Sequence, residues 1–307
     1  MAAAPTSDSG NGPAASAAST VRIGTRRSAL AVRQTELVIE AFKRIRPDYI
    51  YEIHAMQTLG DKDQVTALYN FGGKGLWTNE LEAKLTNNEI DVIVHSLKDM
   101  PTVLPEGCIL GAVVERENPH DVVVFKDTVA DQYKSIADLP AGSVVGTSSI
   151  RRIAQLKRKY PGLQFADVRG NIQTRQGALG IEARTDDDRV LTLLRGIEHG
   201  PTRLAAEAER SVMRTLEGGC SVPIGVETTW RDDGKTLTLK ASVTHVDGTH
   251  GVDGESTRVI ESPEAADQLG RDLAAELVDR GAQTILDDIN QNRPGDQPAT
   301  LPAAAAS

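Results

Sequence analysis

The chain has 307 residues, enough for two or three domains, and its 39% hydrophobic and 25% charged residues are typical of a soluble globular protein. A formal net charge of −9 argues against a nucleic-acid partner, and the presence of only two cysteines, Cys108 and Cys220, excludes a disulfide scaffold and a cysteine-rich zinc site. The six histidines show no metal-ligand spacing, so we expect no metal.

The two ends of the chain differ in composition from the rest. Residues 1–20 and 291–307 are of low complexity, and we expect them to be disordered tails. Residues 1–20 contain no arginine and no apolar core, unlike a mitochondrial or secretory signal. No apolar run reaches membrane-spanning length. We therefore expect a cytosolic protein with no membrane partner.

The first two thirds of the chain alternate between strand and helix patterns. We expect strands at Val21–Thr25, Tyr49–Leu59, Ile90–His95, Ile109–Val114, Val122–Phe125, Val144–Gly146, Gln164–Val168 and Ala178–Glu182. We expect helices from the Ser28 cap to Ile45, from an Asn79–Glu82 capping box to Asn87, and at Ile150–Tyr160, Asp187–Glu198 and Thr202–Leu216. This alternation predicts an α/β architecture that binds its ligand at the carboxyl ends of strands.

After Leu216 the pattern changes. Val222–Thr229 and Thr236–Val246 flank Arg231-Asp232-Asp233-Gly234, which indicates a hairpin. Pro263–Asp287 then predicts a helix. The C-terminal part is therefore expected to form a small α+β domain. The polar, glycine-rich stretch 60–75 is long for a connection, and a mobile lid is one interpretation of it.

Arginines occur at several predicted strand-to-helix turns. Arg26 and Arg27 follow the first strand, Arg151 and Arg152 follow Gly146-Thr147-Ser148-Ser149, and Arg169 and Arg175 follow Val168. A helix N-terminus is partially positive, so arginine is unfavourable there unless an anionic ligand compensates. Guanidinium groups bind carboxylates and phosphates bidentately, which favours a ligand with several such groups. Solvated surface arginines are the alternative for each single residue, and Ser28, Ser148 and Ser149 could cap helices, bind the anion, or both.

Two further residues could carry chemistry. Asp99 follows a buried strand, where its carboxylate could hold a cationic nitrogen or transfer protons, although a turn-forming aspartate before Pro101 is an equal alternative. Lys98 is its natural counterion or another anion ligand. Cys220 lies on a glycine-rich loop after a helix, so its thiol is accessible for a covalent role, whereas Cys108 opens a strand and is expected in the core.

Seven segments together closely resemble the hydroxymethylbilane synthase family, also called porphobilinogen deaminase. They are GTRRSALA (24–31), HSLKDMPT (95–102), ERENPHD (115–121), VVGTSSIRR (144–152), RGNIQTR (169–175), QGALGIE (176–182) and LEGGCSVPIG (216–225). The resemblance implies two domains similar to type II periplasmic binding proteins, with the active site between them, and a third domain. The boundaries carried over are 21–118 with 176–198 for domain 1, 119–175 for domain 2, and 199–290 for the C-terminal domain.

The resemblance also implies a reaction. The family adds four porphobilinogen units head to tail with loss of ammonia, on a dipyrromethane cofactor bonded to a cysteine through a thioether, and releases hydroxymethylbilane by hydrolysis. Cys220 matches the cofactor anchor. Asp99 matches the acid/base residue that holds the pyrrole nitrogens and stabilises the cationic azafulvene formed when ammonia leaves. The substrate is a small molecule, and we expect a monomer.

Further positions match residues that bind the cofactor or substrate. Arg26, Ser28 and Arg175 match substrate-binding positions. Cofactor-binding positions are matched by Lys98, Ser148, Arg151, Arg152, Arg169, Gln176 and Gly177. Each pyrrole brings two carboxylates, which agrees with the electrostatic argument from the arginines.

The chain departs from the family between Arg175 and Gln176. In the family a helix, an apolar strand and a further helix with another substrate-binding arginine separate these two motifs. Here the motifs are joined directly, so roughly forty residues, the size of a strand-helix unit, are missing from domain 2. We expect apolar faces of domain 2 to be exposed or repacked. An inactive or splice-variant family member and a non-catalytic polycarboxylate-binding protein are the alternatives to an active enzyme.

Overall fold

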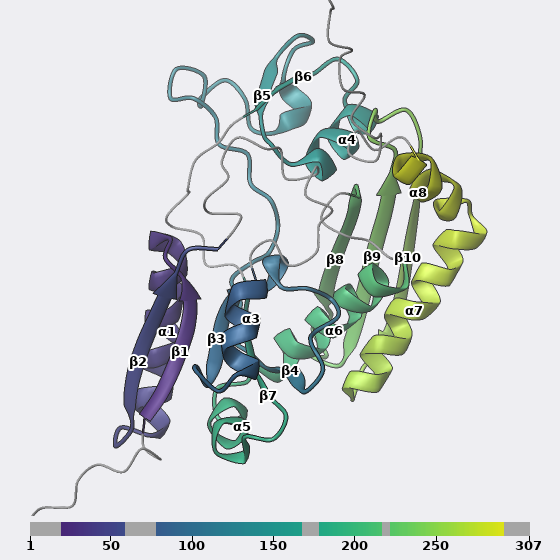
Figure 1. Ribbon diagram of the computed structural model, residues 1–307. Helices are drawn as coiled ribbons and strands as arrows, with labels where there is room; N and C mark the ends of the chain where they lie inside the picture. Colours follow the sequence, from purple (N-terminus) through teal and green to yellow (C-terminus); the bar gives the residue numbers. More distant parts are fainter. Residues whose placement is uncertain (1–19, 59–77, 168–177, 217–221, 292–307) are drawn as a thin grey trace, which may run out of the picture.

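The computed structural model of the protein describes residues 20–58, 78–167, 178–216 and 222–291. Figure 1 shows these residues as a five-stranded sheet with its helices, a small unit around β5, β6 and α4, and a second, three-stranded sheet covered by helices. The described part of the chain is thus a mixed α/β structure with a separate C-terminal domain.

The five-stranded sheet has the order β2-β1-β3-β7-β4. Its strands are β1 (Thr20–Arg26), β2 (Ile50–Met56), β3 (Val92–Ser96), β4 (Cys108–Val113) and β7 (Leu179–Arg184). β1, β2 and β3 run parallel, whereas β7 runs antiparallel to both β3 and β4. The chain therefore leaves this sheet after β4 and returns to its interior through β7.

Helices cover both faces of this sheet. They are α1 (Ala29–Ile45), α3 (Asn79–Thr86) and α5 (Asp188–Arg195). Successive strand residues face opposite sides, so Val92 and Val94 of β3 pack in one cluster with α1 and α5, while Ile93 packs with α3 in another. Because both faces are covered, the strands in the middle of the sheet are almost entirely buried, including their polar residues His95 and Glu182.

Local sequence signals give the correct start for α1 but not for α3. Ser28 caps α1, and its hydroxyl accepts a hydrogen bond from the Ala31 amide at 3.3 Å, as predicted. The capping box predicted at Asn79 and Glu82 is wrong. Thr78 occupies the cap position without a side-chain cap bond, and the Glu82 side chain is buried in the protein instead.

The small unit contains β5 (Val144–Gly146), α4 (Ile150–Lys159) and β6 (Gln164–Ala166), with β5 and β6 paired in parallel. The strand predicted at Val122–Phe125 is wrong, because these residues form no strand in the structure. Val122, Val123 and Val124 are 62%, 47% and 88% exposed. An apolar run needs a neighbouring strand to become part of a sheet, and the described residues supply none here.

Helix α4 connects this unit to the C-terminal domain. Arg158 forms an ion pair with Asp253, with 2.7 Å between Nη2 and Oδ2. Lys157 packs against Gly248, and Gln155 lies against Gly225. The described contacts of α4 across the C-terminal sheet therefore position this unit.

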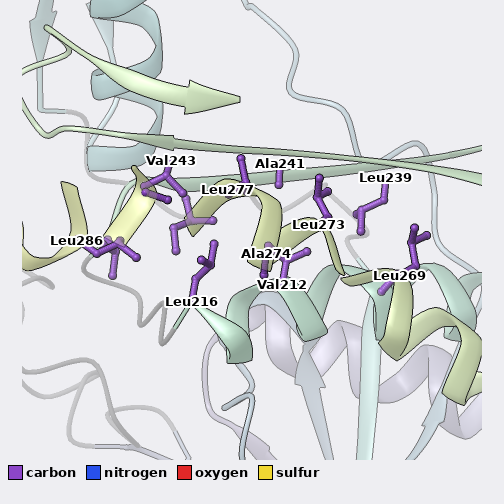
Figure 2. Close-up of a cluster of buried hydrophobic side chains, with 14 of the residues drawn as sticks. Val212, Leu216, Leu239, Ala241, Val243, Leu269, Leu273, Ala274, Leu277 and Leu286 are labelled. Carbon is purple, nitrogen blue, oxygen red and sulfur yellow. The ribbon is translucent and has the colours of Figure 1, made fainter. Parts of the chain in front are cut away.

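The C-terminal domain contains β8 (Ile224–Trp230), β9 (Thr236–Thr244) and β10 (Gly251–Val259) in an antiparallel sheet of order β10-β9-β8. The helices α6 (Gly200–Thr215), α7 (Pro263–Asp279) and α8 (Ala282–Gln291) cover it. Figure 2 shows side chains from α6, α7, α8 and β9 pointing toward one another in its core. The predicted hairpin of β8 and β9 is confirmed, whereas β10 was not predicted. The single helix predicted at Pro263–Asp287 is in fact two helices, which meet at Gly281 with φ of +98°.

None of the helices in the described ranges is long and apolar enough to cross a membrane.

Candidate active site

Arg26 and Asp99 meet at the carboxyl ends of two neighbouring strands. Arg26 is the last residue of β1, and Asp99 lies in the short 3-10 helix η3 (Leu97–Asp99) that directly follows β3. Since β1 and β3 are adjacent and parallel, these ends lie side by side. Arg26 Nη1 lies 3.9 Å from Asp99 Oδ2, and the two side chains are 23% and 32% exposed. A cation and a carboxylate thus lie together at this edge of the sheet, and both side chains are partly exposed.

Buried side chains and hydrogen bonds hold the backbone of the segment that carries Asp99. Leu97 and Met100 on either side of it are buried, and the Met100 amide donates to the Leu97 carbonyl at 3.2 Å. Arg210 of α6 donates to the carbonyls of Met100 and Pro101. Lys98, between these anchors, has an exposed side chain. The arrangement holds the backbone while leaving Lys98 and Asp99 accessible.

Arg210 is a positioning residue that the sequence analysis missed. It is buried, and burial lowers the pKa of its guanidinium to about 10. The sequence does contain a signal for this role. Arg210 lies four residues after Ala206 on the apolar face of α6, where a charged residue is unusual. It links the C-terminal domain to the turn after Asp99.

A buried histidine–glutamate contact lies on the strand that leads to Asp99. His95 Nε2 of β3 is 3.0 Å from Glu182 Oε2 of β7, and both side chains are almost fully buried. Burial, with a further contribution from Glu182, raises the pKa of Glu82. Burial also raises the pKa of the Cys108 thiol to about 11, so the prediction that Cys108 belongs to the core is confirmed. A thiol of this kind is a poor nucleophile at neutral pH.

The second group of predicted residues lies at the start of α4. Ser149 caps this helix by accepting from the Arg152 amide at 3.4 Å, and Ser148 before it is exposed. Arg151 lies in the first helical turn and is half-buried. Arg152 donates two hydrogen bonds to Asp121, at 2.7 and 2.6 Å, which raise the pKa of its guanidinium.

The described site residues therefore form two groups. Arg26, Ser28, Lys98 and Asp99 lie at the ends of β1 and β3, whereas Ser148, Arg151 and Arg152 lie on the small unit that Figure 1 shows beside the C-terminal sheet and apart from β1 and β2. Arg26, Lys98 and Arg151 fit a polycarboxylate ligand by charge and exposure. Arg152 fits it less well, because its guanidinium is already engaged by Asp121.

Five predicted site residues lie outside the described ranges: Arg169, Arg175, Gln176, Gly177 and Cys220. The predicted lid at 60–75 lies outside them too.

Two sequence profiles match the chain. One, "Porphobilinogen deaminase, dipyromethane cofactor binding domain", matches residues 21–175. The other, "Porphobilinogen deaminase, C-terminal domain", matches residues 203–279. The class of protein defined here is therefore a multidomain α/β protein that binds a dipyrromethane cofactor, and the predicted cofactor is confirmed.

Full-length relatives agree with the profiles. Porphobilinogen deaminase of Neurospora crassa is 50% identical over 322 aligned residues that cover 89% of this chain and 95% of the relative. The Saccharomyces cerevisiae protein of that name is 43% identical, covering 89% and 98%, and that of Nostoc sp. is 44% identical, covering 89% and 96%. The chain belongs to the porphobilinogen deaminase family.

The alignment with the Neurospora crassa relative spans 322 positions, more than the 307 residues of the whole chain. That relative therefore contains residues with no counterpart here.

Among solved structures, the regulatory domain of a LysR family regulator from N. meningitidis matches with 11% identity and a TM-score of 0.26, covering 58% of this chain and 92% of the other. A score this low carries no argument about the fold.

Proposed function

We propose that this chain is a hydroxymethylbilane synthase, which condenses four porphobilinogen units head to tail and releases ammonia, in the biosynthesis of tetrapyrroles. The observation that carries the proposal is the pair of opposite charges, Arg26 and Asp99, at the carboxyl ends of β1 and β3. Porphobilinogen carries both an aminomethyl cation and two carboxylates, so a site for it needs groups of both signs.

The chain's own residues have separate tasks in this proposal. Arg26, with Ser28 beside it, binds substrate carboxylates, since guanidinium is always charged and binds them bidentately. Asp99 accepts hydrogen bonds from pyrrole nitrogens and holds the proton that is exchanged when ammonia leaves. Lys98 and Arg151 would hold cofactor carboxylates, and Cys220 would anchor the cofactor. When bound, the dipyrromethane supplies the primer pyrrole to which the first substrate unit is joined.

The Asp99 role can be tested by exchanging its carboxylate for an amide. Asp99→Asn should lower porphobilinogen consumption by about 10²–10⁴-fold, the usual contribution of a positioned acid/base group. Asp127→Asn, which changes an exposed aspartate in a turn, is the matched control and should retain full turnover. Turnover that survives in Asp99→Asn would overturn this role.

The covalent anchor needs a separate measurement. Intact mass of freshly purified chain should exceed the sequence mass by two pyrrole units, in the Asp99→Asn variant as well as in the unaltered chain. Cys220→Ser should lack the additional mass. An unmodified Cys220 in active protein would contradict the assignment of the anchor without affecting the Asp99 result.

We further propose that domain 2 lacks a strand-helix unit between Arg175 and Gln176, and that turnover by this chain is reduced as a result. The three exposed valines at 122–124 and the two-stranded β5–β6 sheet support this, because a missing strand would leave apolar neighbours uncovered. The longer alignment with the Neurospora crassa relative supports it too. Insertion of that relative's intervening residues should raise turnover and protect Val122–Val124 from solvent. No gain on insertion would contradict the proposal.

A cytosolic location and a monomeric state are also proposed here, on the composition of the chain and on the family. Light scattering of the purified chain would test the second.

A further inference from the structure

The turn between β9 and β10 brings two histidines and an aspartate together. His245, Asp247 and His250 each offer a ligand atom, and these atoms all lie within 4.8 Å of one another. The His245 amide donates to the His250 carbonyl at 3.0 Å, which closes the turn at its base. The two imidazole rings are stacked, with centroids 4.9 Å apart and 13° between their planes. This cluster lies outside the site described above.

His245 lies between two carboxylates. Its Nδ1 is 2.7 Å from Asp247 Oδ1, and its Nε2 is 2.9 Å from Asp288 Oδ2 of α8. Among the described residues, Nδ1 is buried and has no partner at an acceptable hydrogen-bond angle. An imidazole nitrogen and a carboxylate oxygen that face each other are both electron-pair donors, and small side-chain rotations would let one cation bind to both. The carboxylate on the opposite ring nitrogen is the usual partner of a metal-bound histidine.

The Thr249 side chain orients the other two groups. Its hydroxyl lies 2.8 Å from Asp247 Oδ1 and 2.8 Å from His250 Nδ1, and the Thr249 amide also donates to Asp247. The cluster is therefore held by hydrogen bonds within the turn before any ion arrives. Such preorganisation reduces the conformational entropy that ion binding would cost.

We propose that His245, Asp247 and His250 bind a divalent transition metal ion of the Zn²⁺ class, with Asp288 as the outer partner of His245. Two imidazoles and a carboxylate suit Zn²⁺ and its neighbours, whereas Mg²⁺ and Ca²⁺ prefer oxygen ligands alone. Three protein ligands leave a position for water. The spacing of the histidines alone predicted no metal, and the pattern proposed here is a His-x-Asp-x-x-His run across one hairpin turn.

The location gives the ion a structural role. Asp288 belongs to α8, and Gly248 at the tip of the turn packs against α4, where an added Cβ would lie 2.9 Å from the Ala154 carbonyl oxygen. An ion in the turn would fix the position of α8 relative to the sheet and support the surface on which α4 rests. Metal binding should therefore stabilise the C-terminal domain.

Isothermal titration of the EDTA-treated full chain with ZnCl₂ tests the proposal. We expect one saturable site in the unaltered protein. His250→Ala removes an exposed ligand and should abolish that site without harm to the core. Asp288→Asn should keep the stoichiometry but weaken the affinity by about 10–100-fold, as expected for an outer partner. His54→Ala is the matched control, since His54 is also exposed and also lies beside a carboxylate, Glu52.

A thermal scan gives a second readout. ZnCl₂ should raise the unfolding midpoint of the unaltered chain and of His54→Ala, but not that of His250→Ala. Absence of saturable binding, or equal binding by His250→Ala and the unaltered chain, would overturn the proposal. So would an equal loss of binding in His54→Ala, because it would mean that scattered surface imidazoles bind the ion.

Discussion

The five-stranded sheet and the β5–α4–β6 unit both carry predicted site residues, but they are built differently. Every residue of β7 is buried, whereas β5 and β6 contain no buried residue. The position of Asp99 is set by the core of its own sheet, with a further anchor from Arg210 of α6. Ser148 and Arg151 are positioned through the contacts of α4 with the C-terminal domain. The residues proposed for one binding site therefore lie on two supports, one enclosed in its own sheet and one held mainly by contacts with the C-terminal domain.

The largest contrast should come from paired polar side chains in the two regions. Glu182→Ala leaves buried His95 without its partner and opens a cavity in the sheet, so we expect a loss of about 3–5 kcal/mol in the free energy of unfolding. Asp121→Ala breaks the exposed pair with Arg152, and such pairs contribute no more than about 1 kcal/mol. Urea unfolding measures both. Equal losses would show that the two regions are packed alike.

Core truncations should repeat the contrast on a smaller scale. Ile181→Ala creates a cavity in fully enclosed β7, and we expect a loss of about 2–5 kcal/mol. Leu163 precedes β6, where few buried neighbours surround it, so Leu163→Ala should cost less than about 2 kcal/mol because the site can collapse or admit water. A larger loss in the free energy of unfolding for Leu163→Ala, measured with urea, would mean that the β5–α4–β6 unit has a better-packed core than the burial of its residues indicates.

The dependence of α4 on the C-terminal domain can be tested at Gly248. This residue has φ of +78°, and an added Cβ would lie 2.5 Å from Lys157 Cβ and 3.0 Å from the Arg158 amide nitrogen. Gly248→Ala should cost about 1–3 kcal/mol and increase hydrogen exchange in residues 144–166. Gly234→Ala is the matched control, since Gly234 has φ of +64° but nothing within 4 Å. If α4 is equally protected from hydrogen exchange in both variants, the contact between Gly248 and α4 does not hold the β5–α4–β6 unit in place.

The smallest effect should be a pH dependence from Glu82 inside the rigid region. Burial raises its pKa in the folded protein, so folding favours the protonated form. The contribution of Glu82 to stability is therefore fully present below its unfolded pKa of about 4.5 and is lost as pH rises through the folded value. Glu82→Gln should be more stable than the unaltered chain at pH 7 and should lose this advantage at pH 4. Thermal scans at both pH values measure the difference.

Local signals predicted most of the elements. The Ser28 cap and the helical period that follows it gave α1, and the turn at Arg231–Gly234 gave the hairpin. The places of Arg26 and Asp99 beyond the ends of two strands were predicted, whereas their 3.9 Å contact was not. These features depend on residues close in sequence or on a topology that the alternation of elements already indicates.

Features that depend on distant partners were missed. β10 contains Asp253, Glu255 and other polar residues, and it is a strand because it pairs with β9 along its whole length. Val122–Phe125 has strand-like residues, but the part of the chain that the structure describes contains no strand that pairs with it. The Arg152–Asp121 pair joins residues 31 positions apart, so no local pattern could show that this guanidinium is engaged.

The burial of Cys108 has a practical consequence for thiol chemistry. With a pKa of about 11 and little exposure, this sulfur will not react with maleimide or dithionitrobenzoate near neutral pH while the protein stays folded. The chain has only one other cysteine, so a colorimetric assay on native protein counts Cys220 alone. If Cys220 is the anchor proposed above, the fraction of molecules that fails to react measures how many carry their primer, without mass spectrometry or turnover.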